Sequence, residues 1–426
     1  MVPVAKSLAG YLKQMSGKDF QVTTLKDAAV PEGYGIVVKV ADEKAAKLGG
    51  DSFSIKTEGN KLWLTGETPL AAGFAVFAFL EQALGCTWWS YNEEEVPTNT
   101  VLKVGPLDVT VKAPFRQTDI GGEGSIRMNN FSLKSRCVST EQFFPLGHSV
   151  YPLLGEYAPK HPEIYPMDKQ GKRAGNNLHF CYLAPGIVDA LCDALEKQIA
   201  EKKGNVRDYI YFVGMGDGSG GMCECPDCKK VYEEETWTDP YGNKFPGYMA
   251  TQLRMMNAVG EKLEKKYPGV RVGCFAYLGL SKPPAKTVAR SNVVVYMTHI
   301  DWCVTHPASE CDNNKTFRAI VERWCQVAPG RVYMWDYAAN FHLAMWPWPN
   351  IHSIAANLRY YAKIGLAGVF LEASSMQGGD LGVLKNYVWR RVMWNPVLDT
   401  DALIREFCTG YYGPAAAEML LSLIHI

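Results

Sequence analysis

Short apolar segments alternate with amphipathic segments over more than half of the chain, and this alternation limits the folds open to it. Residues 209–215 and 292–300 are almost continuously apolar, as in strands buried on both faces. The segments 247–266, 314–327 and 351–364 instead show apolar residues at helical spacing. Buried strands joined through helices form parallel sheets that the helices cover. The pattern therefore predicts an α/β fold.

Seven segments in the second part of the chain read as strands, and an eighth is expected between residues 121 and 172. No glycine-rich dinucleotide fingerprint follows any of them, so a closed (β/α)8 TIM-type barrel is favoured over an open doubly wound sheet. We expect this barrel to span residues 113–420. The seven predicted strands are 115–120, 177–182, 209–215, 270–278, 292–300, 331–337 and 368–373.

The first 112 residues have a different, smaller pattern. Residues 2–17 have helical spacing, and residues 51–57 and 61–65 form a predicted hairpin whose turn contains Gly59. An apolar helix follows from Pro69. We expect a small α/β sandwich domain that is truncated at its start. The last residues, 421–426, are expected to be a non-native tail.

Charge and hydropathy exclude two classes of partner. Lys+Arg and Asp+Glu both number 44, so the formal net charge is zero, whereas nucleic-acid binders carry a basic excess. No apolar run reaches the roughly 18 residues that a membrane span needs. The expected partner is an oligosaccharide or glycan substrate. No export signal is visible.

The active site of such a barrel lies at the carboxyl ends of its strands. Asp217, Asp336 and Glu372 each follow apolar strand residues there. Glycoside hydrolysis uses two carboxyl groups, one as acid and one as nucleophile or base, and these three are the catalytic candidates. The alternatives are a helix cap or turn role for the aspartates and a salt bridge for Glu372.

Aromatic and imidazole side chains accompany these acids. Flat apolar faces with polar edges suit sugar rings, although such residues also fill cores and pack against helices. His148 lies on a long loop, where ligand contacts are common. The candidate substrate-binding residues from this reasoning are His148, His179, Tyr277, Trp335, Tyr337 and Trp346.

Cys223, Cys225 and Cys228 form the sharpest local motif, C-x-C-x2-C. Three sulfurs at this spacing can hold a structural zinc if a fourth ligand comes from elsewhere. Cys181, Cys137 or a histidine are candidates for that ligand. A disulfide or free thiols are the alternatives. No cofactor is required by the expected chemistry.

Several spaced motifs resemble a large bacterial family of glycosidase-like proteins that is described only as a domain of unknown function. Part of that family is similar to endo-β-N-acetylglucosaminidases acting on N-glycans. The first 112 residues resemble the α/β domain that precedes the barrel in hexosaminidases and α-glucuronidases. The motifs are GMGDGSGG at 214–221, CECPDC at 223–228, AY at 276–277, KPP at 282–284, WDYAANF at 335–341, FLE at 370–372, WNP at 394–396 and YYG at 411–413.

The resemblance implies a glycan-cleaving enzyme, adds Asn340 to the substrate-binding candidates, and implies an extracellular or periplasmic location. One position departs from the pattern. Hexosaminidases that use the substrate's acetamido group carry adjacent Asp and Glu, whereas Gly218 follows Asp217 here. The hypothesis is hydrolysis of a glycosidic bond, including β-N-acetylglucosaminide linkages of N-glycans. The rivals are a non-catalytic carbohydrate-binding barrel and a metal-dependent lyase or hydrolase that uses the cysteines.

Overall fold

The computed structural model divides the chain into two compact units. The first comprises residues 1–140, 339–359 and 372–426, and the second comprises residues 141–338 and 360–371. No helix in the described part of the chain is both long and apolar enough to cross a membrane. The structure describes residues 1–25, 30–42, 49–99, 101–121, 131–139, 141–202, 205–343, 345–373, 379 and 381–424.

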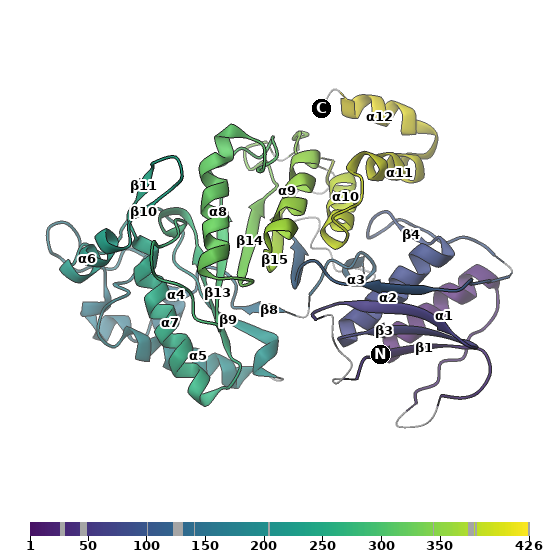
Figure 1. Ribbon diagram of the computed structural model, residues 1–426, viewed down its shortest axis with the longest axis horizontal. Helices are drawn as coiled ribbons and strands as arrows, with labels where there is room; N and C mark the ends of the chain where they lie inside the picture. Colours follow the sequence, from purple (N-terminus) through teal and green to yellow (C-terminus); the bar gives the residue numbers. More distant parts are fainter. Residues whose placement is uncertain are drawn as a thin grey trace. The chain divides into compact units, whose positions relative to one another are not determined.

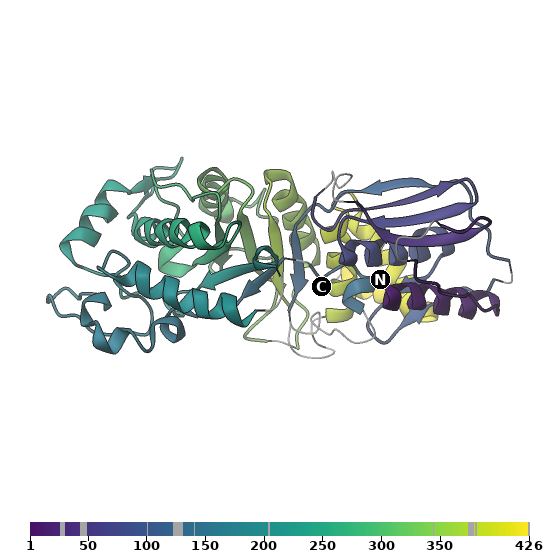
Figure 2. The same cartoon turned by 90° about the horizontal axis from the view of Figure 1, so that it is seen from below.

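The first unit begins with a four-stranded sheet in the order β1-β3-β2-β6. Helices α1 (Val2–Ser16) and α2 (Pro69–Leu84) lie on one face of this sheet (Figure 2). The predicted hairpin is confirmed, and Gly59 supplies its positive φ of 55°. The strands are β1 (Gly35–Val40), β2 (Phe53–Glu58), β3 (Lys61–Gly66) and β6 (Asp108–Val111).

Helix α2 is the core of this sandwich. Thr68 caps its start by accepting a hydrogen bond from the Ala71 amide (3.0 Å), and Gly85 ends it in the left-handed conformation. Every side chain from residue 71 to residue 80 is buried. A helix that is apolar all round must be covered all round. Helix α1 packs against α2 and contributes Leu8, Leu12 and Met15 to this core.

A seven-stranded, nearly closed sheet forms the barrel part, with the strand order β7-β15-β14-β13-β12-β9-β8. The pairs β8–β9, β9–β12, β12–β13 and β13–β14 are parallel. The strands are β7 (Gln117–Ile120), β8 (Gln142–Phe144), β9 (Tyr209–Val213), β12 (Arg271–Ala276), β13 (Val293–His299), β14 (Val332–Tyr337) and β15 (Gly368–Glu372).

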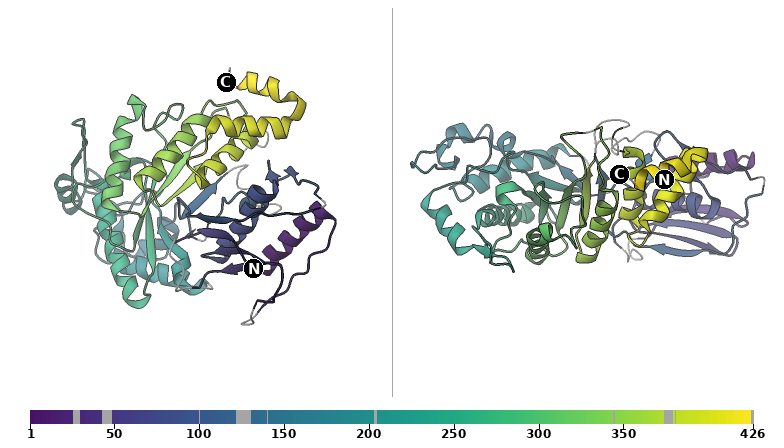
Figure 3. Two further views of the ribbon diagram at one scale, coloured as in Figure 1. Left: turned by 45° about the vertical axis from the view of Figure 1, so that its right-hand side comes forward. Right: turned by 90° about the horizontal axis from the view of Figure 1, so that it is seen from above.

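Helices α5 and α7 pack on the outer face of this sheet, as the alternating pattern predicts (Figures 1 and 3). Their long apolar stripes face the strands, and their charged residues face solvent. The remaining helices are α3 (Phe131–Lys134), α4 (Val150–Leu154), α5 (Ile187–Glu201), α6 (Pro226–Glu234), α7 (Tyr248–Lys266), α8 (Lys315–Val327), α9 (Ile351–Ile364), α10 (Gly382–Trp394), α11 (Thr400–Tyr412) and α12 (Ala416–Ile424).

Four two-residue strands form two further hairpins. The hairpins are β4 (Thr87–Trp88) with β5 (Glu94–Glu95), and β10 (Trp237–Thr238) with β11 (Lys244–Phe245). Helix α12 includes residues 421–424 of the predicted tail, and residues 425 and 426 lie outside the described residues.

One predicted strand is wrong, and the strand count changes with it. Residues 177–182 form no strand, so the described sheet has seven strands instead of eight. Asn177 has a positive φ of 57°, and the Asn176 side chain accepts from the amides of Leu178 (2.9 Å) and His179 (3.0 Å). These local bonds replace the ladder that a strand would make. The strand expected between residues 121 and 172 is confirmed as β8.

Aromatic rings fill the interior of the barrel sheet. Phe143 of β8 contacts the rings of Tyr296 (4.7 Å between centroids) and Tyr333 (5.0 Å), and Phe212 contacts Phe275 (4.6 Å). Most of these pairs are edge-to-face, the arrangement that ring quadrupoles favour. Among the described residues, the interior is therefore a packed core, with no open channel through the strands.

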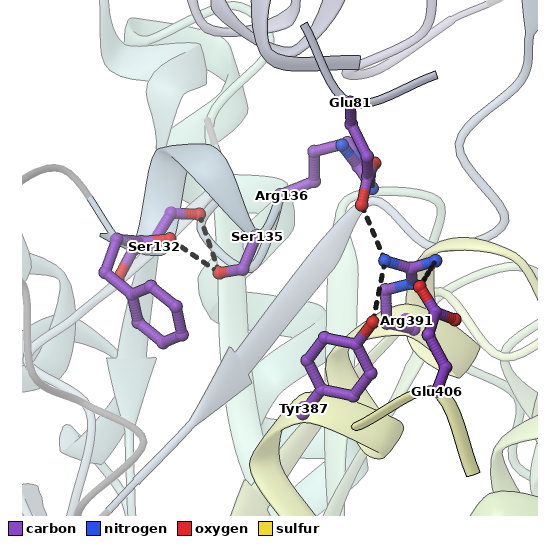
Figure 4. Close-up of polar contacts among 8 residues, drawn as sticks. Glu81, Ser132, Ser135, Arg136, Tyr387, Arg391 and Glu406 are labelled. Atoms are coloured by element: carbon purple, nitrogen blue, oxygen red, sulfur yellow. Dashed lines mark hydrogen bonds and ion pairs between the residues drawn. The ribbon is translucent and has the colours of Figure 1, made fainter. Parts of the chain in front are cut away.

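In the first unit, Glu81 of α2 holds two arginines that are distant in sequence (Figure 4). Its carboxylate lies 2.7 Å from Arg136 and 2.6 Å from Arg391 of α10, and its side chain is only 14% exposed. Arg391 also donates to the Tyr387 hydroxyl (3.2 Å). Two sheltered guanidinium groups thus share one anion.

We expect Glu81→Gln to lower the free energy of unfolding by about 3 kcal/mol, because it leaves two sheltered cations without their counter-ion. Glu406→Gln is the matched control. Glu406 meets the same Arg391 at 3.6 Å but is 43% exposed, so its loss should cost no more than about 0.5 kcal/mol. Urea unfolding followed by tryptophan fluorescence measures both values. Equal effects of the two substitutions would contradict the assignment.

Candidate functional site

Asp217 and Tyr277 meet at the carboxyl ends of β9 and β12, which are neighbours in the sheet. The Tyr277 hydroxyl donates to the Asp217 carboxylate over 3.2 Å. Asp217 is exposed, whereas Tyr277 is 9% exposed. Burial raises the pKa of Tyr277, and the charges of Asp217 and Asp301 add to this effect, which outweighs a hydrogen bond with Tyr337. The phenol therefore stays protonated and acts as a donor to Asp217.

The glycine-rich motif around Asp217 allows backbone segments to approach closely. A Cβ atom on Gly214 would overlap the carbonyl oxygen of Gly147, and one on Gly216 would overlap that of Asn177. The contacts are hydrogen-bonded: the Val150 amide donates to the Gly214 carbonyl (2.7 Å). The motif thus holds the end of β9 between two loops.

His148 comes from the first of these loops and joins the same cluster. Its Nδ1 lies 2.6 Å from the carbonyl oxygen of Met215. A carbonyl only accepts, so Nδ1 carries the proton and Nε2 is the acceptor in the neutral ring. The exposed imidazole lies 6.3 Å from the Tyr277 ring. His148 can therefore accept a hydrogen bond from a ligand hydroxyl.

Trp335 and Tyr337 share one face of β14, because side chains alternate along a strand. The half-buried Trp335 ring contacts Phe275 (6.2 Å) and Phe370 (4.6 Å), so it forms the end of the aromatic interior. Tyr337 lies one step further along the strand, with its ring 6.5 Å from that of Trp335. The polar edge of Tyr337 reaches Tyr277.

The structure places Asp336 on the opposite face of β14. It is 1% exposed, and it accepts a hydrogen bond from the Tyr361 hydroxyl of α9 (2.9 Å). Burial and this neighbouring carboxylate raise the pKa of Tyr361 well above its usual range. Asp336 therefore contacts a covering helix, and the structure does not bring it together with Asp217.

His179 is also buried. Its side chain is 1% exposed, and Nδ1 lies 3.1 Å from the Tyr182 hydroxyl. Burial lowers its pKa to about 4, so the ring is neutral at physiological pH. In this structure His179 supports the loop of residues 176–182 from within.

The other predicted site residues belong to the first compact unit. Glu372 ends β15 and is half-buried. The Asn340 side chain accepts from the amides of His342 (3.1 Å) and Leu343 (3.0 Å), which shapes the loop after β14. Trp346 on that loop is 66% exposed. An indole exposed to this degree is available to a ligand.

The structure brings a fourth cysteine to the C-x-C-x2-C motif. Cys181 joins Cys223, Cys225 and Cys228, and all four sulfur atoms lie within 4.8 Å of one another. All four side chains are buried. Of the fourth partners considered from the sequence, Cys181 is thus the one present in this cluster, and Cys137 lies in the other compact unit.

Sequence reasoning missed a second group of ligand atoms. Cys303, His306 and Cys311 lie on the loop after β13, with the Cys303 sulfur 3.2 Å from Nδ1 of His306. Their C-x2-H-x4-C spacing was a usable signal. Asp301 follows the predicted strand 292–300, and its charge acts on Tyr277 although the two are 24 residues apart.

Glu235 anchors the segment that follows the cysteine loop. It is 1% exposed and accepts four hydrogen bonds, from Arg254 (2.6 Å), the Thr287 hydroxyl (2.6 Å) and the amides of Lys286 (2.8 Å) and Thr287 (3.0 Å). Burial raises the pKa of Glu235, but these donors outweigh it and lower the pKa to about 2. The ionised carboxylate therefore ties the end of α6 to residues 286–287.

The fold and the group formed by Asp217, Tyr277 and His148 indicate the class of protein. It is an α/β protein with a nearly closed parallel sheet whose strand ends carry an acid, a phenol and an imidazole. The chain belongs to the family described as "Domain of unknown function (DUF4838)", whose model matches residues 88–424. No curated protein matches the sequence.

Solved structures of the family 89 glycoside hydrolase from Clostridium perfringens are similar at low identity. One, in complex with its substrate GlcNAc-alpha-1,4-galactose, has a TM-score of 0.47 and 8% identity. Another, in complex with PUGNAc, has a TM-score of 0.45 and 8% identity. Each match covers 96% of this chain and 50% of the other. The chain thus spans about half the length of these structures.

The depressed pKa of Glu235 predicts a pH-dependent contribution to stability. The contribution is fully present above pH 4.5, the ordinary value, and is lost as the pH falls towards about 2. We expect Glu235→Gln to lower the free energy of unfolding by about 2 kcal/mol at pH 7. The difference in unfolding free energy between wild type and Glu235→Gln should narrow below pH 4.5, because the carboxylate of the unfolded chain then takes up a proton while the native one stays ionised.

Denaturation curves measured from pH 7 to pH 3 test this. Glu233→Gln, an exposed position on α6, is the control and should follow wild type throughout. A gap that does not change with pH would contradict the assignment.

Proposed function

We propose that the chain hydrolyses a glycosidic bond in a glycan. The observation that carries the proposal is the exposed Asp217 carboxylate at the end of β9, which accepts from a protonated Tyr277. Active sites of barrel enzymes lie at this end of their strands. We further infer a (β/α)8-type barrel that lacks one regular strand, because residues 177–182 form none and β8 pairs directly with β9.

In this proposal Asp217 is one of the two carboxyl groups that glycoside hydrolysis needs, and Glu372 is the candidate for the other from the sequence alone. Tyr277 donates to Asp217, which suits the anionic role of nucleophile or of base for water. Glu372, which is half-buried, gives its proton to the leaving oxygen as the bond from the anomeric carbon breaks. Water supplies the hydroxyl that ends on the anomeric carbon, and its remaining proton returns to a carboxylate.

The flanking side chains suit a sugar ligand. His148 offers an acceptor at Nε2, and Trp335 and Tyr337 offer flat faces with polar edges. Asn340 and the exposed Trp346 stay candidates for sugar contacts from the sequence alone. Asp336 and His179 are buried and are proposed to position β14 and the loop of residues 176–182. The proposed hydrolysis requires no cofactor.

The first substrates to test follow from the sequence motifs. The family resemblance suggests β-N-acetylglucosaminide linkages of N-glycans, together with a hexosaminidase-like N-terminal domain. A purely carbohydrate-binding barrel would retain the aromatic contacts but release no sugar. A glycan array followed by product analysis by mass spectrometry separates cleavage from binding.

We expect Asp217→Asn and Glu372→Gln each to lower kcat/KM by about 10²–10⁴-fold on the cleaved glycan, because each removes one proton-transfer or nucleophilic group. Tyr277→Phe should cause a smaller loss, because it removes one hydrogen bond and keeps the ring. Steady-state release of reducing sugar measures these effects.

Asp208→Asn is the matched control. Asp208 is an exposed acid that precedes the same strand, β9, at its other end, so the substitution should leave kcat/KM unchanged. Full activity of both Asp217→Asn and Glu372→Gln would refute the proposal. Sugar binding without hydrolysis by wild type would assign the chain to the carbohydrate-binding class instead.

A further inference from the structure

Four buried cysteines from two separate segments converge beside the loop that carries Asp217. Cys223, Cys225 and Cys228 lie on and just after this loop, where α6 begins, and Cys181 comes from the segment before α5. The exposed fractions of the four side chains lie between 1% and 4%. Ordinary free thiols seldom gather four at a time in one protected place, so the convergence requires a physical reason.

The spacing of the sulfur atoms fits one metal ion. A zinc–sulfur bond is about 2.3 Å, so the edges of a tetrahedron of sulfurs around zinc are roughly 3.8 Å. Cys181 lies 3.8 Å from Cys225 and 3.7 Å from Cys228, measured between sulfurs. A disulfide would bring two sulfurs to about 2.05 Å and leave the other two unexplained.

The surroundings suit thiolate ligands as well. The Met167 amide donates to the Cys223 sulfur over 3.3 Å, an outer-shell contact that stabilises a metal-bound thiolate. Arg173 places a positive charge where it acts on Cys181, Cys223 and Cys225. Four thiolates and one divalent ion carry a net charge of −2, which a nearby guanidinium partly offsets.

We propose that Cys181, Cys223, Cys225 and Cys228 bind one structural Zn²⁺. With four protein ligands the site is closed, and no position is left for substrate or water, so the metal supplies stability and takes no part in chemistry. This separates the site from a metal-dependent lyase or hydrolase. The inference does not depend on glycan cleavage and goes beyond it.

The metal would connect two loops that contain few buried apolar side chains. The Cys181 amide bonds to the Ile164 carbonyl (2.7 Å), and the Glu224 amide bonds to the Met167 carbonyl (2.8 Å). The second of these hydrogen bonds joins the segment of residues 164–181 to the loop after β9. Because residues 214–221 are rich in glycine, a metal anchor immediately after them limits the conformations open to Asp217.

Metal analysis of the full chain, expressed with zinc and purified without chelators, is the direct test. We expect one equivalent of zinc bound through these cysteines by elemental mass spectrometry. Replacement by Co²⁺ should give intense visible bands and sulfur-to-metal charge transfer, which report a tetrahedral thiolate site independently of any activity.

Cys181→Ser and Cys228→Ser should each lose this equivalent of metal. Cys303→Ser is the matched control, because Cys303 belongs to the other group of ligand atoms, and it should leave the cobalt spectrum unchanged. Removal of the metal should also increase hydrogen exchange in residues 164–181 and 216–228. If the serine variants fail to fold, the cobalt spectrum of wild type still decides the matter.

Three results would overturn the proposal. The first is wild-type protein free of stoichiometric metal, with its cysteines titrating as thiols. The second is a disulfide among the four cysteines in peptide mapping. The third is a cobalt spectrum that persists in Cys181→Ser or disappears in Cys303→Ser. Iron in place of zinc would refute the choice of metal.

Discussion

The candidate site depends on one close approach, between the glycine-rich end of β9 and the two loops beside it. The backbone at Gly214 and Gly216 touches the carbonyl groups of Gly147 and Asn177, where any side chain would collide. This contact brings His148 from one loop and Cys181 from the other to the strand end that carries Asp217. Glycine at these positions lets the backbone segments come this close together. It also leaves the loop without the side chains that would otherwise restrict its conformations. The proposed zinc site would restrict the chain immediately after this loop.

The aromatic interior of the barrel packs against the same strand ends. Its aromatic rings pack edge to face, so the rings nearest the carboxyl ends, Phe275 and Trp335, rest on a rigid stack instead of on an open channel. Tyr277 and Tyr337 extend this stack with hydroxyl groups. Polar groups thus lie at the carboxyl-end edge of an apolar, aromatic interior.

Much of the architecture could be predicted from local patterns, and the errors have local causes. Apolar strands such as β9 and β13 were predictable because a strand buried on both faces has few alternatives. Residues 177–182 looked like a strand, but Asn176 and the left-handed Asn177 satisfy the backbone locally. Asp336 looked equivalent to Asp217 because both follow apolar strand residues. Its side chain nevertheless points to Tyr361 on α9. In the sequence, only the alternation of side chains along β14 indicates this, because it places Asp336 on the opposite face from Trp335.

By itself, the sequence determined the fold class, the strand ends that carry polar residues and the three cysteines of the C-x-C-x2-C motif, because these depend on residue type and short spacing. Tertiary structure alone decided that Cys181 completes the cluster, that Tyr277 donates to Asp217, and that Glu81 serves two arginines. Each of these contacts joins residues between 42 and 310 positions apart. Such partners are selected by the way whole helices and strands pack together, and local propensity contains no information about that packing.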